Sequence, residues 1–138
     1  HTIEKNKMLS FKNEIKNTSL FKILENRYKG SKCRAKINNF TFDITRKDLL
    51  ELYKKQNGLC YFSGIKMSLD PKCVGRKRNP YVLSIDRLNC NLGYENGNVV
   101  LCCGSINIMK NTLSKEEFIN FCNVISCWNW NPSNHNLN

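Results

Sequence analysis

The run of residues 81–110 constrains the fold most, because its character changes three times over a short length. It predicts a strand over residues 81–88, an irregular polar loop over 89–97, a second short strand over 98–102 and a helix from residue 105. The loop is rich in Asn and Gly, which favour turns and special backbone angles. Apolar residues flank it, so we expect it to be ordered, and ordered polar loops often carry functional groups. The acid and amide groups that this run offers to a site are Asp86, Asn98 and Asn107.

The chain is strongly basic, with 22 Lys and Arg against 11 Asp and Glu and a net charge of +11. Such a charge attracts polyanions, of which nucleic acid is the most common. A solvated surface without a ligand and attraction to an anionic membrane are the alternatives. The 138 residues suit one domain with an ordinary core. No apolar run is long enough for a membrane span and no apolar signal core is present, so we expect an intracellular protein in a reducing environment.

The cysteines do not follow a zinc pattern. No C-x-x-C pair occurs, because Ser63 and Ile106 stand three residues after Cys60 and Cys103. No secretory signal supports a disulfide framework. We therefore expect reduced, mostly buried thiols and no structural Zn²⁺. The eight cysteines are at positions 33, 60, 73, 90, 102, 103, 122 and 127.

Helical periodicity and capping residues predict helices on both sides of the central run. We expect a short helix within residues 1–17 and a longer one from residue 18, with Asn17 or Thr18 as its N-cap. Capping-box patterns begin further helices at Thr45, which we expect to stop at Gly58, and at Ser114. Two tryptophans near the C-terminus, Trp128 and Trp130, are expected to cover the edge of the core. The polar tail from residue 132 is expected to be unstructured.

Basic side chains gather on the second helix and in a loop over residues 64–79. A one-sided basic surface favours phosphate binding, although such a face is often only solvated. The candidates for contact with nucleic acid are Lys22, Arg34, Arg76, Lys77 and Arg78.

Three segments together resemble the HNH-type nucleases of the His-Me finger (ββα-metal) superfamily. They are Q-N-G-L-C-Y-F-S-G-I-K-M, S-I-D-R-L-N…G-Y-E-N-G-N-V-V-L and I-N-I-M-K…L-S-K-E-E-F, and the match is with a phage- and virus-type branch of that superfamily. The resemblance covers roughly residues 18–125. It implies two antiparallel strands and a helix that hold one divalent metal ion against the scissile phosphate.

Residue by residue, the resemblance implies that Asp86 and Asn107 are the metal ligands. Asn98 matches the asparagine that braces the loop, and Lys110 matches a cation that faces phosphate. Carboxylate and amide oxygens are hard ligands that suit Mg²⁺ or Mn²⁺. From the residues alone, a turn-capping carboxylate, a loop amide, a helix-cap amide and a solvated charge are the alternative roles of these four groups.

One position departs from the family pattern. Arg87 stands where these nucleases place the histidine that takes a proton from the attacking water, and arginine cannot accept a proton near neutral pH. Arg87 would instead contact phosphate. The two histidines of the sequence, His1 and His135, lie in the terminal segments. Three readings stay open: another group activates water, the nuclease is weak, or cleavage is lost and DNA binding is kept.

We therefore predict a small single α+β domain with a central ββα-metal unit between N-terminal and C-terminal helices. The expected regions are a basic helical region over residues 1–58, an HNH-like unit with its C-terminal helix over 59–127 and a polar tail over 128–138. The predicted function is a metal-dependent DNA endonuclease or nickase with Asp86, Arg87, Asn98 and Asn107 as its site. The alternatives are a catalytically weak or inactive DNA-binding module of a larger protein and a zinc-stabilised interaction domain.

Overall fold

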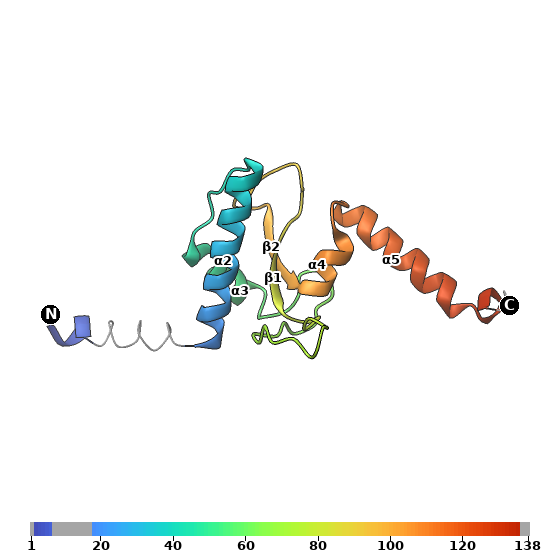
Figure 1. Ribbon diagram of the computed structural model, residues 1–138, viewed down its shortest axis with the longest axis horizontal. Helices are drawn as coiled ribbons and strands as arrows, with labels where there is room; N and C mark the ends of the chain where they lie inside the picture. The colour runs from blue at the N-terminus through green and yellow to red at the C-terminus, as the bar shows by residue number, and fades with distance from the viewer. Residues whose placement is uncertain (1, 7–17, 136–138) are drawn as a thin grey trace.

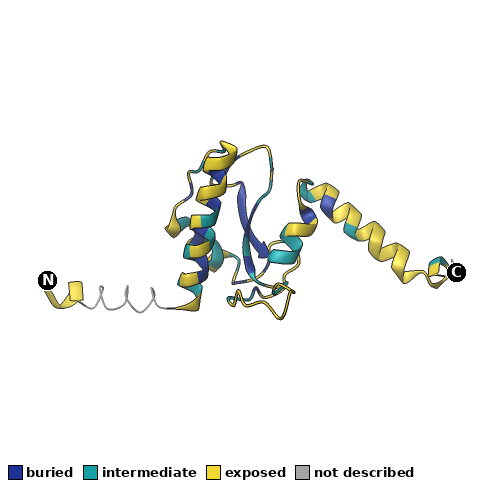
Figure 2. Cartoon of the chain, viewed as in Figure 1, coloured by how far each residue is buried: buried dark blue, intermediate teal, exposed yellow. Residues whose placement is uncertain are grey.

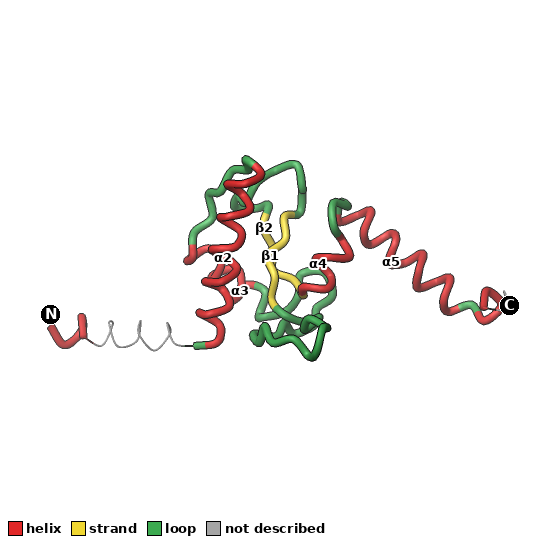
Figure 3. The backbone as a smooth tube through the Cα atoms, viewed as in Figure 1, coloured by secondary structure: helices red, strands yellow, loops and turns green. Residues whose placement is uncertain are grey.

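The computed structural model describes residues 2–6 and 18–135, and it shows a two-stranded sheet surrounded by helices (Figures 1 and 3). The predicted α+β class is confirmed. Residues 2–6 are helical, while the rest of the helix expected over residues 1–17 falls outside the described residues. Among the described residues, no helix is long and apolar enough to cross a membrane.

Helix α2, Ser19–Asn38, packs one apolar stripe against the sheet and leaves its basic side open. Thr18 caps it, because the Thr18 side chain accepts a hydrogen bond from the Phe21 N–H at 3.2 Å. The stripe recurs every three or four residues, the spacing that places side chains on one helix face. Its buried members are Ile23, Leu24, Tyr28, Ser31 and Ala35.

Helix α3, Arg46–Lys55, begins at the predicted capping box, in which Thr45 and Asp48 exchange side-chain and backbone hydrogen bonds. It ends before the expected stop at Gly58, with Gln56 as its C-cap. Gly58 instead lies in the turn beyond, with a φ of 69° that favours glycine. The long connection from α3 to the sheet follows and runs mostly without regular structure (Figure 3).

Strands β1, Leu83–Arg87, and β2, Val99–Cys103, pair antiparallel, with Asp86 opposite Val100. The ends of both strands differ from those expected from the sequence by no more than two residues. Every residue of β2 is buried, because α3 contacts this strand and α4 packs against both strands (Figure 2).

Helix α4, Gly104–Lys110, follows β2 without a connecting loop. Its first residue lies in a tight space, because a Cβ atom on Gly104 would lie 3.1 Å from Val82 Cγ1. The Gly104 N–H also donates to the Val82 carbonyl at 2.8 Å. This close approach sets the start of α4 against the segment that leads into β1.

Helix α5, Lys115–Trp130, begins at the predicted capping box of Ser114 and Glu117 and extends away from the sheet (Figure 1). Only Phe118 is buried along it. The expectation that two tryptophans cover the core edge is wrong, because Trp128 and Trp130 are 53% and 83% exposed. The tail is not fully irregular either, since a 3-10 helix, η1, covers Pro132–His135.

All eight cysteines are free thiols, as expected, but they are not mostly buried. Only three of them are buried: Cys60, Cys102 and Cys103. Burial raises the pKa of Cys103 to about 11, so this thiol stays protonated at neutral pH.

Candidate metal and phosphate site

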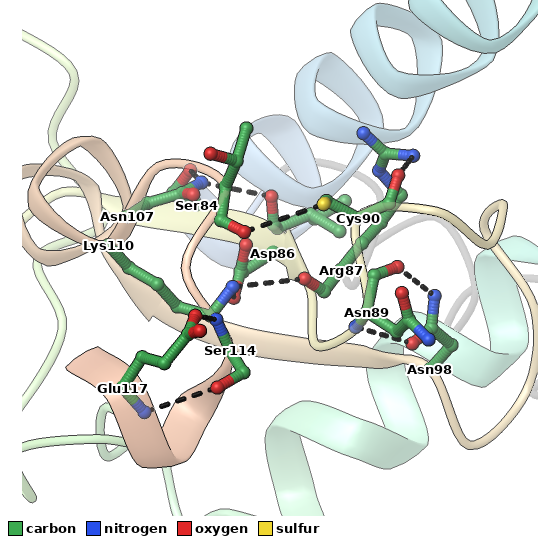
Figure 4. Close-up of polar contacts among 12 residues, drawn as sticks. Ser84, Asp86, Arg87, Asn89, Cys90, Asn98, Asn107, Lys110, Ser114 and Glu117 are labelled. Atoms are coloured by element: carbon green, nitrogen blue, oxygen red, sulfur yellow. Dashed lines mark hydrogen bonds and ion pairs between the residues drawn. The ribbon is translucent and has the colours of Figure 1, made fainter. Parts of the chain in front are cut away.

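Asp86 lies on β1 and is buried, with 6% of the residue exposed (Figure 4). Its Oδ2 atom is 3.2 Å from Lys110 Nζ, an ion-pair distance, yet this oxygen accepts no hydrogen bond from any described residue. Burial raises the pKa of Asp86, and the positive charge of Lys110 only partly opposes that shift. A buried carboxylate oxygen without a hydrogen bond is costly, which makes it a candidate ligand atom.

Lys110 ends α4 and its side chain is fully buried. Besides the ion pair, its Nζ donates a hydrogen bond to the Arg87 carbonyl oxygen at 3.2 Å. We expected Lys110 to face phosphate. In this structure the side chain has no exposed surface, so contact with phosphate stays a prediction. Its position one turn after Asn107 turns it toward β1 instead.

Asn107 lies midway along α4 and is tied to β1 through its amide nitrogen. Nδ2 donates to the Ser84 Oγ atom at 2.8 Å and to the Ile85 carbonyl at 3.0 Å (Figure 4). Both N–H groups of the amide are thereby used, which fixes the orientation of the side chain. No described residue donates to its Oδ1 atom, so the amide oxygen remains available as a ligand beside the strand that carries Asp86.

Asn98 is buried and braces the loop between the strands, as the resemblance implies. Its Oδ1 atom accepts from the Asn89 N–H at 2.9 Å, and Nδ2 donates to the carbonyls of Asn89 and Gly93 at 3.1 and 2.9 Å. Gly93 allows the loop to pack closely on the preceding segment, because a Cβ atom there would clash with the Thr41 carbonyl oxygen. The loop that positions the end of β1 is therefore closely fixed.

The guanidinium of Arg87 also serves this loop. Its Nη1 donates to the carbonyls of Cys90 and Leu92 at 3.0 and 2.8 Å. The group stacks on the Phe40 ring, 4.0 Å from the centroid, and lies 5.4 Å from that of Tyr94. Arg87 lines the same cleft as Asp86, but these bonds hold its cation against the protein, and contact with phosphate stays a prediction.

An open cleft of about 880 Å³ brings Asp86 and Asn107 to one surface with several arginines. Of the basic residues predicted from the sequence, Arg34 and Arg78 line this cleft. Lys22 lines a second hollow beside α2 instead. Arg76 and Lys77 are exposed on the turn closed by the Val74–Lys77 bridge and do not line the cleft.

Histidine is absent from the cleft lining among the described residues. His135 lies in η1 beyond the far end of α5, where its Nε2 is 3.1 Å from the Asn129 carbonyl (Figure 1). His1 falls outside the described residues. In the described part of the chain, no three His, Cys, Asp or Glu side chains gather as a metal cluster. A metal ion held here would thus rely on Asp86, Asn107 and non-protein oxygens, an arrangement that Mg²⁺ accepts.

Ser84 and Arg27 line the cleft with polar groups and were not among the sequence-based candidates. Ser84 supports the Asn107 amide, and its position two residues before Asp86 on one strand face was the available signal. Arg27 lines the cleft from α2 and was visible only as part of the basic side of that helix.

No family model matches the chain. The chain is 31% identical over 104 residues to the uncharacterized protein R423 of Acanthamoeba polyphaga mimivirus. The matched region covers 75% of this chain but spans only 17% of the length of R423. Among solved structures, the chain is similar to the rare-cutting HNH restriction endonuclease PacI, with a TM-score of 0.57 and 21% identity. That likeness covers 78% of this chain and 80% of the PacI chain. The protein therefore has the fold of an HNH-type nuclease.

Proposed function

We propose that this protein is a metal-dependent DNA endonuclease that uses Asp86 and Asn107 to hold one Mg²⁺ or Mn²⁺ ion. The observation that carries the proposal is a pair of side-chain oxygens, Asp86 Oδ2 and Asn107 Oδ1, that accept no hydrogen bond from a described residue at a strongly basic cleft in an HNH-type fold. Asp86 Oδ2 is ion-paired with Lys110, and a bound metal ion would take the place of that contact. Both atoms are hard oxygen ligands. The likeness to PacI supports a nuclease, and DNA as substrate is taken from PacI. The mimivirus relative R423 supports only a viral relationship.

Each residue of the site has a separate task in this proposal. When bound, the ion would polarise the phosphoryl oxygen and stabilise the leaving oxygen. Asp86 and Asn107 hold it, Ser84 fixes the Asn107 amide, and Asn98 with Arg87 fixes the loop after β1. Lys110 neutralises the Asp86 carboxylate when no ion is present. Because no imidazole lines the cleft in the described residues, we expect turnover about 10²- to 10⁴-fold below that with a positioned base.

A specific observation favours a second candidate, a DNA-binding module without turnover. The ammonium group of Lys110 already stands 3.2 Å from the carboxylate that would bind the metal, and the position of the family's histidine holds Arg87. This module would bind DNA in a salt-dependent manner without metal and would not cleave it even at high protein concentration.

A plasmid-cleavage assay in Mg²⁺, Mn²⁺ or EDTA separates the candidates. We expect metal-dependent cleavage by the wild type, and a loss of at least about 100-fold in Asp86→Asn and Asn107→Ala, the range found when an electrostatic contact in a transition state is removed. Asp43→Asn and Asn123→Ala make the same chemical changes at exposed positions and should retain cleavage. Melting curves establish that the variants fold.

Two results would overturn the proposal. Cleavage that persists in folded Asp86→Asn would show that the site lies elsewhere. No cleavage by the wild type in excess over plasmid, with either metal, would leave the DNA-binding module as the function.

A further inference from the structure

We propose that Arg27, Arg34 and Arg78 form a phosphate-binding site of their own in the cleft that Asp86 and Asn107 also line. The three residues come from two parts of the chain, since Arg27 and Arg34 lie on α2 and Arg78 lies in the loop before β1. The site would hold a backbone phosphate of a nucleic acid without metal. Reading the anion as nucleic acid rests on the proposed function, whereas the anion site itself does not.

The charge around these arginines is not neutralised by the protein. Asp86 is the one acidic residue among the described residues that line the cleft, and it pairs with Lys110. None of the ion pairs within the described residues involves Arg27, Arg34 or Arg78. Three cations without a counter-ion in one concave surface attract a multivalent anion.

Two of the three side chains are held in position. Arg27 Nε donates to the Leu83 carbonyl at 2.8 Å, which ties α2 to the first residue of β1. Arg34 Nη2 donates at 3.1 Å to the hydroxyl of Ser31, a residue with no exposed surface. Each guanidinium carries five N–H donors, so both keep donors free for a ligand. Anchored guanidinium groups lose less conformational entropy on binding phosphate than free surface lysines do.

The arginines are close enough to repel one another. Burial lowers the pKa of Arg27 most, and the charges of Arg34 and Arg78 lower it further. Arginine nevertheless stays protonated in proteins, so the repulsion is not relieved by loss of a proton. A bound phosphate would relieve it, and its oxygens match the forked donors of arginine.

The central test measures binding of a labelled DNA duplex in EDTA over a salt series, so that cleavage plays no part. The triple variant Arg27→Gln, Arg34→Gln, Arg78→Gln should reduce the slope of log K against log salt by about 2 to 3, since each lost phosphate contact lowers it by about 0.9. The matched control Lys47→Gln, Lys54→Gln, Lys55→Gln removes the same charge from α3, away from the cleft. We expect a change of less than about 1 in the control slope.

Single variants separate binding from folding. Arg27→Gln also removes a bond to β1, whereas Arg78 makes no hydrogen bond to a described residue, so Arg78→Gln tests the site without that risk. Inorganic sulfate is the second probe. Sulfate at low millimolar concentration should raise the melting temperature of the wild type and of the α3 control more than that of the cleft triple variant. Binding to the folded state adds to the general stabilisation that sulfate gives to any folded protein.

Equal loss of affinity and slope in the cleft and α3 triple variants would overturn the proposal, since diffuse charge would then explain binding. So would an equal response of all three proteins to sulfate. The two proposals fail separately. If the wild type never cleaves but the cleft triple variant still has a smaller slope of log K against log salt, only the nuclease proposal is overturned. If the wild type cleaves but both triple variants bind DNA with the same affinity and salt slope, only the arginine-site proposal is overturned.

Discussion

Two ion pairs in this protein have similar chemistry and opposite surroundings. Arg46 on α3 meets Glu25 on α2 through two aligned hydrogen bonds of 2.7 and 2.9 Å at a partly exposed junction. Lys110 meets Asp86 at 3.2 Å beneath the cleft, where both side chains are almost fully buried and the contact lacks hydrogen-bond alignment. The hydrogen-bond geometry is thus better in the exposed Arg46–Glu25 pair, whose charges water could also solvate, than in the buried Lys110–Asp86 pair.

The pKa shifts of the two carboxyl groups go in opposite directions for this reason. The hydrogen bond from Arg46 holds the pKa of Glu25 below its ordinary value of 4.5. Burial raises the pKa of Asp86 despite its neighbouring ammonium group. The first pair joins two helices. The second leaves a buried carboxylate oxygen without a hydrogen bond, which costs free energy of desolvation. That difference is what we expect if the buried pair serves the proposed ligand site and not stability.

Removing one partner of the buried pair should have the largest effect. In Lys110→Ala the Asp86 carboxylate stays buried without a cation, so we expect a loss of about 3 to 5 kcal/mol in the free energy of unfolding, measured by urea titration. Lys36→Ala removes a lysine from the exposed side of α2 and should change it by less than about 0.5 kcal/mol. Equal losses in the two variants would mean that the buried pair carries no special cost.

Replacing both partners tests whether the buried pair stabilises the fold at all. The variant Asp86→Leu, Lys110→Met fills the same space without charge, so we expect stability equal to the wild type or about 1 to 4 kcal/mol higher, together with loss of Mn²⁺ binding. The same urea titration and a calorimetric metal titration measure the two outcomes. The surface counterpart Glu25→Leu, Arg46→Met should lose about 0.2 to 1 kcal/mol. A double variant less stable than the wild type would show that the pair is a net stabiliser.

Much of the fold could be predicted from local signals in the sequence. The capping residues Thr18, Thr45 and Ser114 each begin the helix that they were expected to begin, because a cap is a contact between near neighbours. The α+β class followed from the strand, loop, strand and helix order of one continuous run. Helix ends were less accurate, as the early stop of α3 before Gly58 shows.

The surroundings of the site residues could not be predicted in the same way. The resemblance assigned Lys110 to phosphate, but its burial depends on how closely α4 approaches β1, a distance set by packing between elements. Arg87 was expected at phosphate, and its bonds to loop carbonyls depend on the course of the loop after β1. The grouping of Arg27 with Arg78 joins residues far apart in sequence, which no local pattern encodes.

The surface pair should give the smallest effect, one that depends on pH. Because the pKa of Glu25 is lower in the folded protein than in the unfolded chain, its contribution is fully present above about pH 4.5 and is lost as the pH falls through the folded value. We expect Glu25→Gln to cost about 0.2 to 1 kcal/mol at pH 7, since the Arg46 side chain is 55% exposed and water screens the pair. The difference from the wild type should shrink in acid. Urea titrations from pH 7 to pH 3 measure this difference.

Glu51→Gln, which breaks a more exposed contact of 3.7 Å with Lys47, is the matched control and should cost less at pH 7. A difference between Glu25→Gln and wild type that grows in acid would contradict the sign of the shift, and a cost above about 2 kcal/mol would remove the contrast between the surface pair and the buried one.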